Sequence, residues 1–119
     1  MPGRLTTHVL DTAQGRPAAG MRIELHALDL SGEWSLITTV RTNADGRTDA
    51  PLMAGEQFAR GLYEIVFFVG EYFAAQGVAT AKPPFLDRVP VRFGIAEADG
   101  HYHVPLLTSP WAYSTYRGS

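Results

Sequence analysis

The segment Met21-Arg22-Ile23-Glu24-Leu25-His26-Ala27-Leu28 decides the fold class. Its apolar side chains stand at every second position and alternate with charged or polar ones. Because successive side chains of a strand point to opposite faces, this pattern is typical of a strand with one buried and one wetted face. The segment therefore predicts a sheet that covers a core on one side.

Other segments extend this pattern along the chain. Residues 89–95 alternate in the same way, and residues 34–42 form a further expected strand. Residues 62–69 begin by alternating and end apolar on both faces, which is typical of a strand in mid-sheet or one whose outer face another subunit covers. Short segments separated by 12 glycines and 8 prolines predict an all-β sandwich of roughly eight strands.

One helix and two turns are expected between the strands. Residues 71–76 favour a short connecting helix, and Gly77 after them can take the left-handed conformation that ends a helix. Residues 14–17 and 43–46 have the composition of turns. Arg47 follows an Asp-Gly pair, which predicts a hairpin that presents this arginine at the start of a strand.

Length and composition indicate an ordinary soluble globular protein. The 119 residues predict a single domain over positions 1–119, with enough chain to bury a core. A formal net charge of −2 with scattered charges disfavours nucleic acid as a partner, and no apolar run approaches the length of a membrane span. The absence of cysteine excludes disulfides and thiolate chemistry. Without a visible signal peptide, we expect a cytoplasmic protein.

Three histidines are candidates for chemistry. If Leu5 and Val9 face the core, His8 points to the outer face of its sheet, and alternation places His101 and His103 together on an outer face near the other end of the chain. Each of these histidines, taken alone, has the ordinary interpretation of a solvated surface residue. His26 also alternates outward, with no recognisable residues around it.

The last eleven residues, 109–119, carry three aromatic side chains with Ser and Thr between them. A chain terminus is normally polar and poorly ordered, so this composition predicts a docked terminal strand. From the residues alone, an aromatic edge strand and a functional segment are equally good interpretations.

Read together, these segments resemble a known family. Leu5-Thr6-Thr7-His8-Val9-Leu10-Asp11 at the start, Gly15-Arg16-Pro17-Ala18, the 43–47 turn, His101-Tyr102-His103-Val104-Pro105-Leu106-Leu107 and the terminal Tyr116-Arg117-Gly118-Ser119 follow in order along the chain. Their pattern is similar to that of the 5-hydroxyisourate hydrolases, transthyretin-like enzymes of purine degradation. The terminal tetrapeptide distinguishes these enzymes from the transthyretin hormone carriers of the same fold.

The resemblance implies an architecture, an assembly and a reaction. It implies a transthyretin-like sandwich of two four-stranded sheets, and a homotetramer with its active sites where two dimers meet. The apolar and aromatic outer faces are compatible with such an assembly. The implied reaction is the hydrolysis of 5-hydroxyisourate to 2-oxo-4-hydroxy-4-carboxy-5-ureidoimidazoline in urate degradation, without a cofactor or metal.

The resemblance also implies roles for particular residues. His8, Arg47, His103 and Ser119 are the predicted catalytic residues, and His8, Arg47, Tyr116 and Ser119 are the predicted substrate-binding residues. We assign the general base to His103, with His8 orienting or sharing the proton, although the sequence does not settle which histidine takes it. Arg47 would hold the substrate and stabilise oxyanion charge, and His101 would be a wall residue.

Four alternatives stay open. The protein could be a carrier that binds a small aromatic ligand without chemistry, or a structural sandwich module, although neither explains the terminal motif. His8, His101 and His103 could form a three-histidine zinc site, which lacks an obvious carboxylate to orient the ligands. Ser119 could be a nucleophile, but it lies outside any nucleophile-elbow context.

Overall fold

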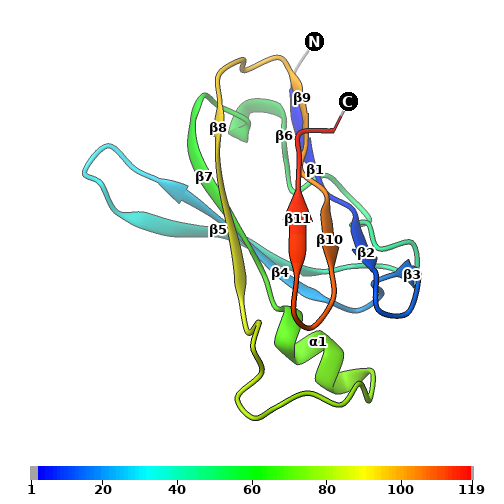
Figure 1. The fold of residues 1–119 in the computed structure, drawn as a ribbon. Helices are drawn as coiled ribbons and strands as arrows, with labels where there is room; N and C mark the ends of the chain where they lie inside the picture. The colour runs from blue at the N-terminus through cyan, green and yellow to red at the C-terminus, as the bar shows by residue number, and fades with distance from the viewer. Residues whose placement is uncertain (1–2, 119) are drawn as a thin grey trace.

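The computed structural model describes residues 3–118 and consists of two layers of strands packed face to face (Figure 1). One layer is a four-stranded antiparallel sheet in which the alternating segment 21–28 forms a central strand and the alternating segment 89–95 an edge strand. Its spatial order is β5 (Trp34–Arg41), β4 (Arg22–Leu28), β7 (Gly61–Phe67) and β8 (Val89–Ile95). The mid-sheet position expected for the apolar segment is confirmed, since β7 lies between β4 and β8.

The other layer is built from two shorter sheets placed end to end. The first has the order β6 (Met53–Ala54), β1 (Arg4–Thr6) and β9 (His101–His103). The second has the order β3 (Arg16–Pro17), β2 (Val9–Asp11), β10 (Leu106–Thr108) and β11 (Tyr113–Thr115).

Backbone hydrogen bonds join these two sheets into one layer. The Val104 N–H donates to the Thr6 carbonyl and the Leu106 N–H to the His8 carbonyl, each at 2.9 Å. Beyond β11 the chain returns to β9 through a bridge between His103 and Gly118. Four chain segments therefore lie side by side along this layer, and the predicted sandwich of two four-stranded sheets is confirmed.

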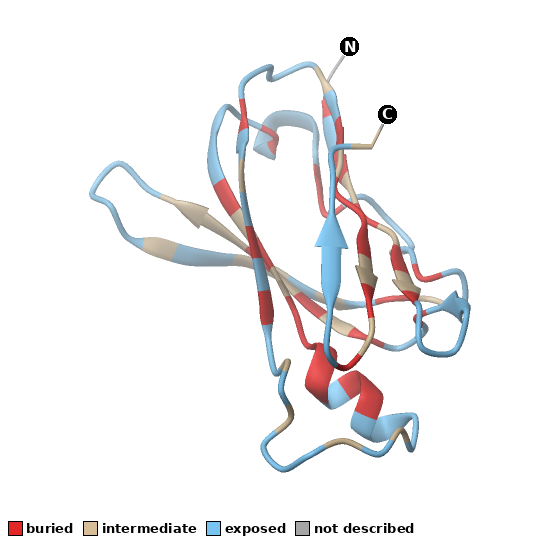
Figure 2. Ribbon diagram, viewed as in Figure 1, coloured by how far each residue is buried: buried red, intermediate tan, exposed pale blue. Residues whose placement is uncertain are grey.

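Alternation along the first strand separates core from surface as expected. Leu5 and Val9 are fully buried, Thr7 is buried with its hydroxyl donating to the Val104 carbonyl at 2.7 Å, and His8 between them is half-buried. Figure 2 shows the same alternation of buried and more exposed positions along the strands of both layers. The predicted outward direction of His8 is thus confirmed.

The boundary between β7 and the helix differs from the prediction. The strand ends at Phe67 rather than at residue 69, and α1 (Val69–Ala75) begins two residues earlier than expected. Phe68 and Val69 are both buried, so their apolar character reflects the turn into the helix rather than a continuing strand. The helix ends as predicted, with Gly77 at a φ of 74°. Among the residues described, no helix has the length and apolar character needed to cross a membrane.

The loop that carries Arg47 is fixed by a close backbone contact. The Gly46 carbonyl accepts from the Val9 N–H at 2.8 Å, and the Asn43 side chain accepts from the backbone N–H groups of Asp45 and Arg47. Arg47 lies in the loop between β5 and β6, so the prediction that it begins a strand is wrong. Its turn contacts Val9 on β2 of the other layer instead of forming a hairpin with β5.

Gly46→Ala should destabilise the protein far more than a matched change elsewhere. Gly46 has a φ of 75°, and a Cβ there would collide with the Val9 carbonyl oxygen. Gly15 has a φ of 70° with nothing near its Cβ position, so Gly15→Ala tests the backbone conformation alone. Urea denaturation at fixed protein concentration should show a loss of about 1 kcal/mol for Gly15→Ala and about 3 kcal/mol or more for Gly46→Ala. Equal losses would mean that the docking contact carries no free energy.

Candidate active site

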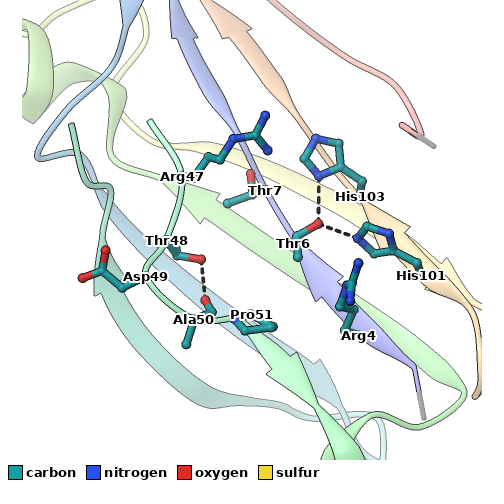
Figure 3. A pocket seen from close by; sticks show the side chains of 10 residues that line it. All are labelled: Arg4, Thr6, Thr7, Arg47, Thr48, Asp49, Ala50, Pro51, His101 and His103. Carbon is teal, nitrogen blue, oxygen red and sulfur yellow. Dashed lines mark hydrogen bonds between the residues drawn. The ribbon is translucent and has the colours of Figure 1, made fainter. Parts of the chain in front are cut away.

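A hollow lies where β1, β9 and the 47–51 loop meet, on the outer face of the layer that is built from two shorter sheets. The hollow has a volume of about 430 Å³. Most of its lining residues have polar side chains, and they come from three separate parts of the chain (Figure 3). The lining residues are Arg4, Thr6, Thr7, Arg47, Thr48, Asp49, Ala50, Pro51, His101 and His103.

A single hydroxyl group links the two histidines of this hollow. Thr6 Oγ1 lies 2.8 Å from His103 Nδ1 and 2.9 Å from His101 Nε2. The parallel pairing of β1 with β9 sets Thr6 opposite His103 and Arg4 opposite His101. In Figure 3 the other ring nitrogen of His103 lies on the side toward the Arg47 guanidinium. The hollow thus combines two imidazoles, two guanidinium groups, three threonines and one carboxylate.

The surroundings of His103 favour its neutral form. Burial lowers the pKa of His103 below its ordinary value of 6.5, and the positive charges of Arg47, His101 and His8 lower it further. Burial and the neighbouring Arg4 also lower the pKa of His101. Near pH 7, His103 therefore carries a ring nitrogen with a free lone pair, which is what a general base requires.

The C-terminal tail packs directly against His103. The Gly118 N–H donates to the His103 carbonyl at 2.8 Å. A Cβ at Gly118 would lie 2.5 Å from His103 Cδ2 and 3.1 Å from Cγ, so only glycine fits beside the imidazole ring. The glycine of the terminal motif is therefore in contact with the predicted base.

The predicted site residues do not all fall in the same place. Arg47 and His103 line the hollow together, and His101 lines it too, as expected of a wall residue. His8 does not line it but is close enough to influence the pKa of His103. Tyr116 lines a second hollow between β8 and the tail, beside Tyr102 and Arg117. Ser119 lies outside the described residues.

Thr6 is the residue that sequence reasoning missed. Alternation already placed it on the outer face with His8, so a signal was present in the first motif. What the sequence lacked was the register between β1 and β9, which brings the Thr6 hydroxyl between two imidazoles.

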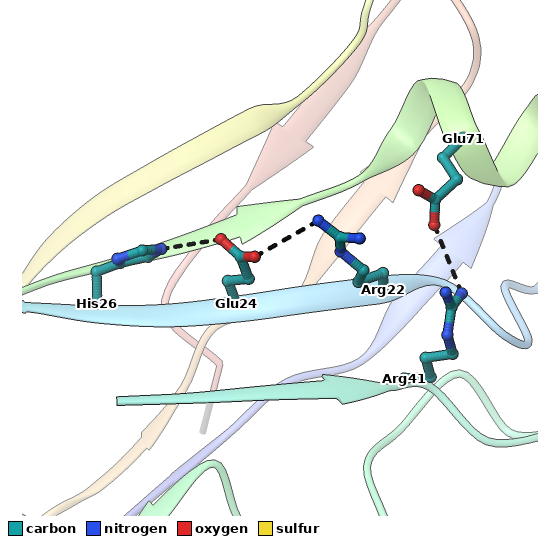
Figure 4. A network of polar contacts seen from close by, with 5 residues as sticks. All are labelled: Arg22, Glu24, His26, Arg41 and Glu71. Carbon is teal, nitrogen blue, oxygen red and sulfur yellow. Dashed lines mark hydrogen bonds and ion pairs between the residues drawn. The ribbon is translucent and has the colours of Figure 1, made fainter. Parts of the chain in front are cut away.

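The fourth histidine belongs to a separate polar network. His26 Nε2 lies 3.1 Å from Glu24 Oε1 on β4, and Arg22 approaches the same carboxylate at 3.6 Å (Figure 4). These residues lie in the four-stranded sheet, away from the hollow. His26 therefore serves as a comparison for the histidines of the site.

Within residues 3–118, no three His, Asp or Glu side chains are grouped so that they could hold a metal ion. His8, His101 and His103 all lie within this range. The three-histidine zinc alternative therefore has no cluster to support it in this part of the chain.

Comparison with known proteins identifies the family. The model of the HIUase/Transthyretin family matches residues 5–118. The chain belongs to this family. It is 62% identical to the "5-hydroxyisourate hydrolase 2" of Rhizobium meliloti (strain 1021), over 98% of this chain and 97% of that protein.

Two solved structures show the same fold. A crystal structure of (S)-allantoin synthase superposes with a TM-score of 0.94 at 53% identity and covers 99% of this chain, which spans only 44% of that longer chain. Sea bream transthyretin in complex with thyroxine superposes with a TM-score of 0.88 at 31% identity, over 97% of this chain and 94% of that one. The transthyretin-like fold is thereby confirmed, and this chain is far more similar in sequence to the hydrolase than to the thyroxine-binding protein.

The pKa of His103 should respond to Arg47. Arg47→Gln removes a positive charge that disfavours the imidazolium, so the pKa of His103 should rise toward 6.5 from a lower value in the parent protein. Titration of the imidazole signals by NMR measures this directly. Arg92→Gln is the matched control, because Arg92 pairs with Glu64 in the other layer. A His103 pKa at or above 6.5 in the parent, or one indifferent to Arg47, would contradict the electrostatic description.

Proposed function

We propose that this protein hydrolyses 5-hydroxyisourate to 2-oxo-4-hydroxy-4-carboxy-5-ureidoimidazoline in urate degradation. The observation that carries the proposal is a neutral imidazole and a guanidinium sharing one hollow, His103 and Arg47. The proposal is supported by high identity to a protein named as this hydrolase, since that identity extends over nearly the whole length of both chains.

The proposed reaction begins with attack by water. His103 accepts a proton from the water as its oxygen attacks a ring carbonyl, and the carbonyl oxygen becomes an oxyanion. Arg47, which is permanently charged and forked, holds the substrate and stabilises that oxyanion. Collapse of the tetrahedral intermediate breaks the bond to the ring nitrogen, which takes the proton back from His103. The ring opens and one water molecule is added.

The remaining predicted residues have supporting roles. His8 orients the water or shares the proton, since its charge already influences the pKa of His103. Tyr116 and Ser119 belong to the same terminal motif as Gly118, which packs on His103, and we propose that they bind substrate or water. No cofactor is required by this chemistry.

We further propose that the protein is a homotetramer with its active sites at the dimer–dimer interface. The aromatic side chains of the tail support an interface there, because Trp111, Tyr113 and Tyr116 are all exposed on this chain alone. β11 is also an edge strand with one side open to pairing. The cytoplasmic location stays a prediction from the sequence.

The competing function is a carrier for a small aromatic ligand, as the thyroxine complex of sea bream transthyretin illustrates for that protein. A carrier needs shape and apolar surface, whereas this hollow is lined largely by arginine, threonine and histidine. One assay separates the two functions. 5-Hydroxyisourate is generated from urate with urate oxidase, and its decay is followed with and without the protein. The hydrolase accelerates the decay in proportion to its concentration, and a carrier leaves the rate unchanged.

Loss of the base should reduce the rate while the fold is retained. His103→Ala should lower turnover of 5-hydroxyisourate roughly 100- to 10,000-fold, the usual effect of removing a general base. His26→Ala is the control, since His26 contacts Glu24 in the other layer. Circular dichroism of both variants verifies the sandwich. Near-parental turnover in His103→Ala would remove this histidine from the mechanism.

A side chain placed against the His103 imidazole should also lower turnover. Gly118→Ala places a methyl group against the His103 ring, so the ring must move and turnover should fall roughly 100-fold. Ser114→Ala, an exposed position on β11 of the same tail, should leave turnover unchanged. Equal turnover in the two variants would show that the tail does not set the position of His103.

A further inference from the structure

The hydroxyl of Thr6 contacts one nitrogen of each histidine in the hollow, at 2.8 Å from His103 Nδ1 and 2.9 Å from His101 Nε2. A hydroxyl has one proton to donate and lone pairs with which to accept. A neutral imidazole has one N–H donor and one acceptor nitrogen. The hydroxyl cannot donate to both rings, so the protonation of one histidine is linked to that of the other.

If both imidazoles are neutral and Thr6 donates its hydroxyl proton to one of them, two arrangements are possible. In the first, Thr6 donates to His101 Nε2 and accepts from His103 Nδ1–H, which leaves His103 Nε2 with a lone pair facing the hollow. In the second, the direction is reversed, His103 Nε2 carries the proton, and the ring has no free nitrogen with which to accept one. Only the first arrangement makes His103 a base toward a water in the hollow.

The position of Arg47 favours the first arrangement. The guanidinium of Arg47 lies toward His103 Nε2 and can only donate, so it attracts a lone pair at that nitrogen and repels an N–H (Figure 3). At the other end, burial and Arg4 lower the pKa of His101, so His101 is neutral, as both arrangements require. The charge that discriminates between the two arrangements is therefore that of Arg47.

We propose that Thr6 is a positioning residue that, together with His101, fixes the proton of His103 on Nδ1 and so keeps Nε2 free as the proton acceptor. An unconstrained imidazole prefers the opposite tautomer, with its proton on Nε2, so the hydroxyl holds the ring in the form that the reaction needs. When His103 takes the proton, its Nδ1–H still donates to Thr6, and the new imidazolium keeps this partner. The proposal deepens the proposed function, on which it rests for the role of His103.

The direct test is the tautomer itself. Nitrogen-15 NMR of imidazole-labelled protein distinguishes a protonated from an unprotonated ring nitrogen. At a pH where His103 is neutral, the parent protein should show protonation of His103 at Nδ1, and Thr6→Val should move the proton toward Nε2. A parent protein protonated at His103 Nε2 would overturn the proposal. This measurement needs no substrate, so it decides the proposal even if 5-hydroxyisourate proves not to be hydrolysed.

Kinetics give the second test. Thr6→Val keeps the shape of the side chain without its hydroxyl and should lower kcat roughly 10- to 100-fold, the effect usual for removing a partner that orients a functional histidine. Thr6→Ser restores the hydroxyl and should recover most of the rate. Thr39→Val, an exposed position on β5 in the other layer, is the matched control and should be unaffected. Parental kcat in Thr6→Val would overturn the proposal.

A double-mutant cycle tests whether Thr6 and His101 act on His103 as a unit. His101→Phe removes the acceptor at the exposed end, where the fold does not depend on the ring, so the freed Thr6 proton can turn to His103 Nδ1. The variant should show the same tautomer shift and a similar loss of kcat. Combining it with Thr6→Val should add little further loss. If the double variant loses kcat by the product of the two single losses, or if His101→Phe changes neither kcat nor the tautomer, Thr6 and His101 act separately and their joint role is overturned.

Discussion

β1 pairs with β9 in parallel, with Leu5 opposite Tyr102 and Thr6 opposite His103. Leu5 and Tyr102 are buried in the core, so the side chains on either side of them must point outward. A slip of one residue would turn the apolar side chains to the surface and the polar ones into the core, and the cost of that exchange fixes the register. The free energy that holds the core together therefore also determines which groups meet in the hollow. The site needs no separate device to align Thr6 with His103.

Two glycines allow the other segments of the site to approach these strands. Gly46 lets the loop before Arg47 approach the backbone of Val9, and Gly118 lets the tail pass against the His103 ring. Neither contact tolerates a side chain, so the first holds the loop that carries Arg47 against Val9 and the second holds the tail against the His103 ring. The tail helps to bury the imidazole, and burial is the largest cause of its lowered pKa. Packing and protonation at this residue are consequences of the same contacts.

The sequence predicted those features that depend on local periodicity. Alternation correctly directed His8, His101 and His103 outward, and of the two positions predicted for the 62–69 segment from its apolar faces, the mid-sheet one is observed. The end of that segment was wrong, because a short apolar run does not distinguish a buried strand from a buried turn into a helix. Arg47 was placed at a strand start for a similar reason: a turn motif does not reveal which distant backbone it will contact. The role of Thr6 was missed because it depends on a pairing with residues 95 and 97 positions away. Local patterns thus fix directions of side chains, whereas the meeting of groups requires the tertiary register.

The lowered pKa of His103 poses a chemical question, since a weaker base accepts a proton less readily. The proposed substrate offers an answer. Arg47 depresses the pKa of His103 through the positive charge of its guanidinium. When negative charge arrives, first with an anionic substrate and then with the developing oxyanion, it offsets the field of Arg47 at the imidazole. In the proposed reaction, the pKa of His103 then rises as negative charge develops, so the residue is neutral before substrate binds and is a stronger base when the proton is transferred. Arg47 and His103 are therefore coupled through the charge of the substrate, and the value of either residue to the reaction depends on the presence of the other.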